Sequence, residues 1–136
     1  MKSPSGTETT RGPQDWVRLF FSSAGRMGRG PFLVAIAVLL ALFAGYDTAV
    51  HGWLRAATGW LVFLVLVFSA ACVLSKRLHD RGRAGWWAGV VLLAFVVVWP
   101  WPQGVVDALF LAVLVWSAVD LGAMPGRPGF NRYGPP

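Results

Sequence analysis

The sequence predicts an all-α fold: an integral membrane protein with four transmembrane helices and a short interfacial helix at the amino terminus. Hydrophobic residues make up 56% of the chain and charged residues 13%, against about 45–50% and about 25% in soluble domains. The charged residues also gather between long apolar runs, and the basic ones are distributed unevenly among the loops. Helices this apolar on all sides would need a much larger soluble protein around them, so a soluble fold is not predicted.

Four apolar segments are the candidate transmembrane helices, expected at residues 31–50, 56–75, 86–101 and 105–123. A bilayer core needs about 20 residues of helix. The second segment carries no formal charge and is the clearest span. The apolar part of the first segment is too short, so flanking residues are expected to complete the helix. Pro31 is suited to its first turn. The third begins and ends with tryptophan, and Pro100 and Pro102 are expected to stop it.

The amino terminus is expected to lie outside the membrane domain, which we place at residues 15–135. Residues 1–14 are polar and lack the apolar stretch of a secretory signal, so they are predicted to form a disordered tail. Asp15 can cap a short helix, and the aromatic and aliphatic residues around Arg18 suit a helix lying in the interface. The alternative is that this segment merely extends the first span.

The distribution of lysine and arginine predicts the orientation in the membrane. Four spans return both termini to one side, together with the hinge Lys76 to Trp87 between the second and third spans. Eleven of the 12 basic residues lie on that side, and the opposite loops hold only Arg55. The positive-inside rule therefore places both termini and the hinge in the cytoplasm. This explains the net charge of +6 better than nucleic-acid binding, which needs basic residues gathered on one soluble face.

Two aspartates interrupt the fourth segment. Asp107 lies in its first turn, where the positive end of the helix dipole favours a carboxylate. Asp120 lies at the carboxyl end, where the dipole opposes a negative charge. We therefore expect Asp120 to pair with a hinge arginine, and Arg77, Arg81 and Arg83 are the candidates.

The hinge also contains His79 beside Asp80, a combination that can act as a general base when the carboxylate orients the imidazole. No serine or threonine nucleophile occurs within the hinge, so no catalytic residue is predicted. His51 and His79 are expected on opposite sides of the membrane, and Cys72 is the single cysteine, so neither a metal site nor a cofactor is predicted.

Three motifs carry a family resemblance. The hinge Lys-Arg-Leu-His-Asp-Arg-Gly-Arg-Ala-Gly-Trp-Trp, residues 76–87, resembles the Arg-Arg-Leu-His-Asp…Ser-Gly-Trp-Trp signature of the DUF805 family of small bacterial inner-membrane proteins. Residues 21–29 and 126–135 resemble the family's Phe…Gly-Arg…Arg and Gly…Gly-x-Asn-x-Tyr-Gly-Pro stretches. Lys76, Ala84 and the pair Pro31-Phe32 depart from the family pattern. The resemblance implies a multi-span protein of the bacterial inner membrane, with no established activity, cofactor or substrate.

Together these observations predict a cytoplasmic polar cap over the helices. We expect it to contain Arg26, Arg29, Arg77, His79, Asp80, Arg81, Arg83, Asp120 and Asn131. Arginines suit phosphate, so the favoured function is a non-enzymatic bundle whose cap contacts anionic membrane lipid or a partner protein. The alternative is a subunit of a small transporter or channel, which would need a polar path formed by a homo-oligomer. An enzyme acting on lipid headgroups through His79 and Asp80 comes third.

Overall fold

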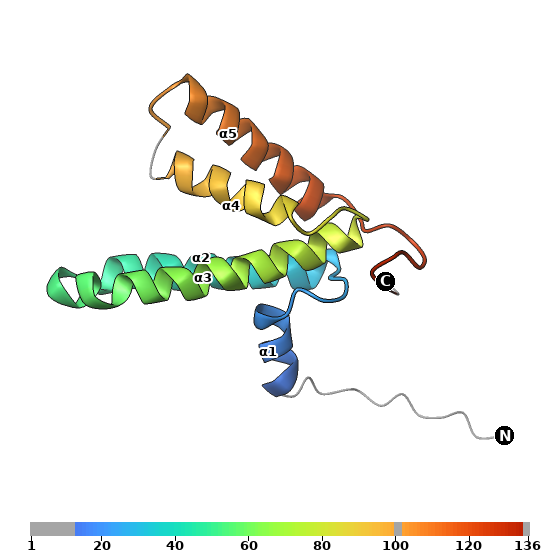
Figure 1. Ribbon diagram of the computed structural model, residues 1–136, viewed down its shortest axis with the longest axis horizontal. Helices are drawn as coiled ribbons and strands as arrows, with labels where there is room; N and C mark the ends of the chain where they lie inside the picture. Colours follow the sequence, from blue (N-terminus) through green and yellow to red (C-terminus); the bar gives the residue numbers. More distant parts are fainter. Residues whose placement is uncertain (1–12, 100–101, 135–136) are drawn as a thin grey trace.

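The computed structural model describes residues 13–99 and 102–134 (Figure 1). Within them the chain is helical and has no strand, which confirms the predicted all-α class. The elements are α1 (Pro13–Phe21), α2 (Arg29–Ala49), α3 (Gly52–Asp80), α4 (Trp87–Val98), α5 (Val105–Ser117) and the π-helix η1 (Ala118–Ala123), which continues α5. Residues 1–12 of the predicted disordered tail lie outside the described residues, and Pro13 and Gln14 already belong to α1.

Three helical segments are long and apolar enough to cross a membrane: α2, α3, and α5 together with η1. The second predicted span proves longer than the segment 56–75, because α3 begins at Gly52 and extends into the charged hinge as far as Asp80. The third predicted span is shorter than expected: α4 has 12 residues, a rise of roughly 18 Å. Val98 is its last residue, and Pro100 lies just outside the described part.

The helices form two hairpins that meet at one end. Helix α3 contacts α1, α2 and α4, while α4 pairs with α5 and α2 contacts η1. The amino ends of α2 and α4 and the carboxyl ends of α3 and η1 therefore lie together (Figure 1), and the two hairpins diverge away from that end. Helix α1 lies at a steep angle to α3 beside the same end.

Most of the apolar surface of the long helices is not covered by protein. Only 17%, 22% and 17% of the most apolar windows of α2, α3 and the α5–η1 segment are buried. Exposed tryptophans lie near both ends of the bundle, with Trp16, Trp86 and Trp87 at the end where the hairpins meet and Trp53 and Trp99 at the other. Apolar flanks between two tryptophan belts are typical of a membrane protein.

Asp107 lies at the start of α5. Its Oδ2 accepts hydrogen bonds from the backbone N–H groups of Gln103, at 2.7 Å, and Gly104, at 3.1 Å. Two N–H groups at the helix start, which lack partners within the helix, are thereby satisfied. Asp107 therefore caps its helix by hydrogen bonds, in addition to the favourable dipole interaction that its position in the first turn predicts.

Candidate functional site

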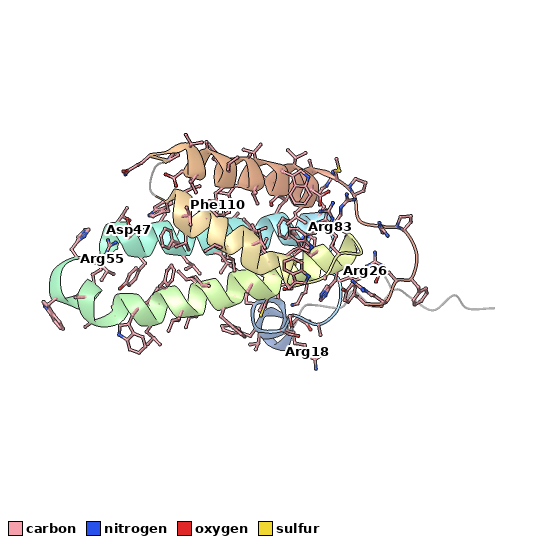
Figure 2. The ribbon with its side chains drawn as sticks, turned by 45° about the horizontal axis from the view of Figure 1, so that its top comes forward. Arg18, Arg26, Asp47, Arg55, Arg83 and Phe110 are labelled. Atoms are coloured by element: carbon pink, nitrogen blue, oxygen red, sulfur yellow. The ribbon has the colours of Figure 1, made fainter. Side chains whose placement is uncertain are left out.

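The predicted polar residues meet where the two hairpins converge, and we call this group the cap. It contains Arg26, Arg29, Arg77, His79, Asp80, Arg81, Arg83, Asp120 and Asn131. Figure 2 shows Arg26 and Arg83 at this end and Asp47 and Arg55 at the other. All nine predicted residues are brought together, but their partners differ in part from those expected.

Arg77 lies at the centre of the cap, and none of its surface is exposed. Its guanidinium donates to the carbonyl oxygens of Leu121 at 2.7 Å and Met124 at 2.5 Å, and to Oδ2 of Asp80 at 2.6 Å. A further donor lies 3.4 Å from the carbonyl of Met27. A buried guanidinium is tolerated where its fixed fork of donors finds acceptors. Arg77 thus joins the end of α3 to the end of η1.

Asp80 accepts from two arginines. Its Oδ2 lies 2.6 Å from Nη1 of Arg77, and its Oδ1 lies 2.9 Å from Nη2 of Arg26. Its backbone carbonyl accepts from the N–H of Arg127 at 3.0 Å. The carboxyl-terminal segment passes so close that a Cβ added to Gly126 would lie 2.0 Å from Oδ2 of Asp80. A glycine is therefore required at this approach.

Arg26 holds the carboxyl-terminal segment in place. Its side chain is 2% exposed, and besides Asp80 it donates to the carbonyl oxygens of Arg127 and Gly129, each at 2.6 Å. A weaker bond of 3.3 Å reaches the carbonyl of Gly134. One side chain from the segment before α2 therefore binds three carbonyls of the last described residues.

Asp120 pairs with the hinge. Its Oδ1 lies 2.9 Å from Nη2 of Arg81 and 3.5 Å from Nη2 of Arg83, and the Arg83 guanidinium also lies over the ring of Trp116. The expected pairing is therefore made by Arg81 and Arg83. Arg77, the third candidate, turns to Asp80 instead.

The arginines also cap the end of the last helix, which the sequence reasoning missed. A helix leaves its final carbonyl groups without partners inside the helix. Here Arg29 donates to the carbonyl of Ala123 at 3.1 Å and Arg81 to that of Pro125 at 2.6 Å, in addition to the two bonds from Arg77. Peptide carbonyls thus take many of the donors that the sequence analysis assigned to phosphate.

His79 and Asp80 do not form the pair that a general base requires. Nδ1 of His79 lies 3.2 Å from the carbonyl of Gly25, and its ring stacks on Tyr133 with centroids 3.8 Å apart. The Asp80 carboxylate is directed to the two arginines. In the described part of the chain, no group of three or more His, Cys, Asp or Glu side chains could hold a metal ion.

Asn131 orders the carboxyl-terminal turn. Its Nδ2 donates to the carbonyl of His79 at 3.0 Å, and its Oδ1 accepts from the N–H of Tyr133 at 2.8 Å. The backbones of Asn131 and Gly134 form an isolated antiparallel bridge. The amide therefore fastens the turn that carries Tyr133 onto the end of α3.

Lys76 is a cap residue that the predicted set omitted. It is 6% exposed, and its ammonium group donates to the carbonyl oxygens of Arg18 and of Leu19, the latter at 2.9 Å. Both carbonyls belong to the last turn of α1, where a cation also suits the helix dipole. Lys76 therefore docks α1 onto α3. The position of Lys76 at a helix end and the short amino-terminal helix were both predicted, but the contact between them was not.

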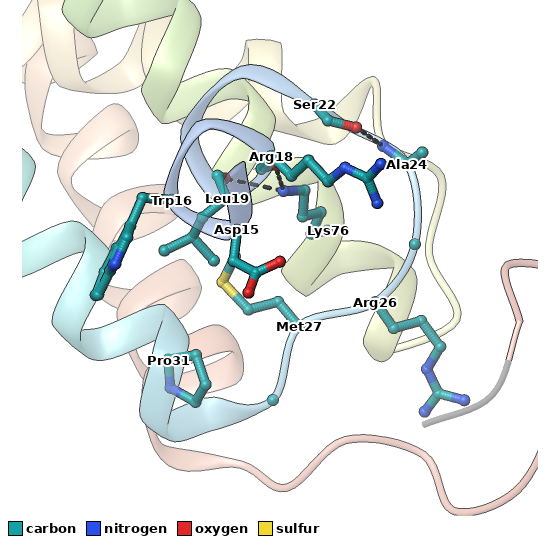
Figure 3. A pocket seen from close by; sticks show the side chains of 12 residues that line it. Asp15, Trp16, Arg18, Leu19, Ser22, Ala24, Arg26, Met27, Pro31 and Lys76 are labelled. Carbon is teal, nitrogen blue, oxygen red and sulfur yellow. Dashed lines mark hydrogen bonds between the residues drawn. The ribbon is translucent and has the colours of Figure 1, made fainter. Parts of the chain in front are cut away.

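A pocket of about 640 Å³ lies between α1 and the start of α2 (Figure 3). Ionisable, aromatic and aliphatic side chains line it together. They are Asp15, Trp16, Arg18, Leu19, Ser22, Ala24, Gly25, Arg26, Met27, Gly28, Pro31 and Lys76. Sequence reasoning did not predict this pocket, because it exists only where α1 docks on α3.

Comparison with known proteins identifies the family. The family described as "Protein of unknown function (DUF805)" matches residues 20–135, which is most of the chain. The chain belongs to the DUF805 family. The uncharacterized protein YiiR of Escherichia coli is 35% identical over 133 residues, covering 89% of this chain and 87% of YiiR. The inner membrane protein YhaH of Escherichia coli is 25% identical over 131 residues, covering 89% of this chain and 94% of YhaH.

A probable alpha-(1->6)-mannopyranosyltransferase of Mycolicibacterium smegmatis is 33% identical over 96 residues, which cover 71% of this chain but 15% of that protein. No solved structure matches. The DUF805 motifs gain a physical meaning from the cap, because each of the three contributes to it. Arg26 comes from the first motif, Asp80 from the second and the carbonyl of Gly129 from the third. In this DUF805 member the three motifs are one contact network.

Proposed function

We propose that the chain is a non-enzymatic, four-span protein of the bacterial inner membrane, with its termini and cap on the cytoplasmic side. In this arrangement α2, α3, α4 and α5 with η1 cross the bilayer, and α1 lies in the interface. The cap closes the bundle, and exposed arginines around the cap contact anionic lipid headgroups.

The orientation is supported by charge. Of the described basic residues, Arg55 lies at the end of the bundle away from the cap, paired with Asp47 (Figure 2). The arginines of the hinge and of the α1–α2 segment lie at the cap. Because cytoplasmic loops carry the excess of lysine and arginine, the cap end is the cytoplasmic one.

One observation carries the lipid contact: the buried cations of the cap are used internally, while other arginines and several tryptophans around it are exposed. Arg18, Arg127 and Arg132 have exposed side chains, while Trp16 is 45% and Trp86 64% exposed. Tryptophan rings lie at headgroup depth, and each basic residue near an anionic surface contributes about 1 kcal/mol of attraction. Basic and aromatic side chains together favour the membrane surface over a soluble partner.

The proposal that the protein is not an enzyme rests on the contacts of Asp80 and His79, the two residues that could act as a general base. The Asp80 carboxylate is neutralised by two arginines, and His79 is stacked on Tyr133 and faces a backbone carbonyl. Neither is directed at the other, so the general-base arrangement has no support in the geometry.

The test is lipid retention by the full-length protein, extracted gently from membranes that contain phosphatidylglycerol and studied by native mass spectrometry. The wild type should retain phosphatidylglycerol. In the triple variant Arg18→Gln/Arg127→Gln/Arg132→Gln the amount of retained phosphatidylglycerol should be more than tenfold lower, because each arginine contributes about 1 kcal/mol. Arg55→Gln, at the far end, is the matched control and should retain it. Equal retention by the triple variant would contradict the proposal. If the wild type retains a protein but no anionic lipid, the result would favour a partner protein over lipid as the contact of the exposed arginines.

A further inference from the structure

We infer that the pocket between α1 and the start of α2 binds the phosphate headgroup of an anionic phospholipid. This inference rests on the proposed function, because it requires the cap to face the headgroups of the cytoplasmic leaflet. It goes further by assigning one lipid to one place.

The pocket has a size and position that suit a headgroup. Its volume of about 640 Å³ lies within the range of about 300–1,000 Å³ that is usual for small-molecule sites. Helix α1 forms one wall and the segment leading into α2 forms another (Figure 3). If α1 lies in the interface, this pocket lies at headgroup depth.

The charges of the lining side chains favour an anion. Arg18, Arg26 and Lys76 contribute three positive charges and Asp15 one negative charge, which leaves a net charge of +2 (three minus one). Asp15 has interactions of its own, so it is not free to receive a cation. A phosphate is the ligand class that matches this balance.

Two of the three cations retain donors for such a ligand. The Arg18 guanidinium makes no hydrogen bond to the part of the chain that the structure describes. An ammonium group has three N–H donors, and Lys76 uses two of them on the carbonyls of α1. Arg26, in contrast, is engaged by Asp80 and the carboxyl-terminal carbonyls. Arg18 and Lys76 are therefore the residues that we expect to bind the phosphate.

The apolar part of the lining distinguishes a lipid from a free phosphate. Figure 3 shows Trp16 and Pro31 on one side of the pocket and the side chains of Arg18 and Arg26 on the other. Leu19 and Met27 add further apolar surface. A soluble phosphate would gain nothing from these groups, whereas the glycerol and upper acyl carbons of a phospholipid would be buried against them.

The test places a photo-crosslinking amino acid at Ser22, which lines the pocket, or at Phe130, which is 84% exposed and lies outside it. The full-length protein is reconstituted in vesicles of phosphatidylcholine with a minority of phosphatidylglycerol, and adducts are identified by mass spectrometry. The crosslinker at Ser22 should capture phosphatidylglycerol well above its share of the vesicle, and the one at Phe130 should follow the vesicle composition.

Arg18→Gln should lower the phosphatidylglycerol adduct at Ser22 about fivefold, the equivalent of about 1 kcal/mol for one basic residue. It leaves the Arg18 carbonyl, and so the anchor of Lys76, in place. Arg55→Gln, which removes an exposed arginine at the far end of the bundle, should leave the adduct unchanged. Adducts that follow vesicle composition at Ser22 would overturn the inference, as would equal adducts in the two variants. If millimolar inorganic phosphate abolishes the phosphatidylglycerol adduct at Ser22, the pocket binds free phosphate, and the assignment of a lipid as its ligand is wrong.

The two proposals can fail separately. If the wild type retains phosphatidylglycerol in native mass spectrometry but the Ser22 adduct shows no preference, the pocket assignment is wrong and the lipid-contacting cap stands. If the wild type retains no anionic lipid at all, both are wrong.

Discussion

The two ends of the bundle use the same ion-pair chemistry in opposite surroundings. At the cap, Arg77 and Arg26 bind Asp80 with side chains that are 0%, 2% and 6% exposed. At the far end, Arg55 binds Asp47 at 2.6 Å with side chains that are 50% and 40% exposed. The distances are similar, so burial decides the energetic weight. Breaking a buried pair leaves an unpaired charge without solvent and costs about 3–5 kcal/mol, whereas an exposed pair contributes about 0–1 kcal/mol.

The largest expected effect is at the centre of the cap. Arg77→Met removes every bond of this guanidinium to Leu121, Met124 and Asp80, and it leaves Asp80 with Arg26 alone. We expect the free energy of unfolding, measured by titration with a denaturing detergent, to fall by about 3–5 kcal/mol. Arg55→Met is the matched control at the far end. A similar, small loss in both variants would show that burial does not separate the two ends.

An intermediate effect is expected where the carboxyl-terminal segment approaches α3. Gly126→Ala places a methyl group against the Asp80 carboxylate, where the ideal position is only 2.0 Å from Oδ2. The backbone or the carboxylate must move, and overpacking of this kind costs about 1–3 kcal/mol. Hydrogen exchange should show faster exchange in residues 126–134. Gly28→Ala is the control, because a Cβ there meets nothing within 4 Å; equal stability of the two variants would contradict the close approach.

The smallest effect is expected for the pair at the far end. Asp47→Asn, Arg55→Gln and the double variant form a thermodynamic cycle for this exposed contact. Its coupling energy should be below about 1 kcal/mol and should fall further in high salt. A coupling energy of several kcal/mol would mean that this end is shielded from water in the membrane, and it would remove the contrast with the cap.

The sequence predicted the helical fold and the gathering of polar residues because both depend on one-dimensional patterns. Apolar runs mark helices, and the alternation of basic and neutral loops brings Arg26, Arg81 and Asp120 to one end. The position of Asp107 in the first turn of its helix predicted a favourable dipole interaction, but not its hydrogen bonds to Gln103 and Gly104. The helix dipole predicted that Asp120 pairs with a hinge arginine, but left Arg77, Arg81 and Arg83 open as the partner.

The rest depends on contacts that no pattern encodes. Arg77 was a candidate partner of Asp120, but its donors reach Asp80 and the carbonyls of η1, because those carbonyls lie beside it in space. Lys76 caps α1 only because α1 packs on α3, and the pocket beside α1 has the same origin. The short length of α4 reflects where its helix ends, at Val98, before a proline that the sequence analysis placed inside the span.

The bonds of Arg26 bear on the order in which the protein matures. This guanidinium binds carbonyls 103 and 108 residues further along the chain, so it can find these partners only after the helices between them have been synthesised. The helices can enter the membrane one after another during synthesis, while Arg26 stays hydrated. Closure of the cap therefore follows synthesis of all the helices, and a polypeptide truncated before Gly126 would keep its helices and the contact of Arg26 with Asp80 but lack the three carbonyl acceptors of the carboxyl-terminal segment.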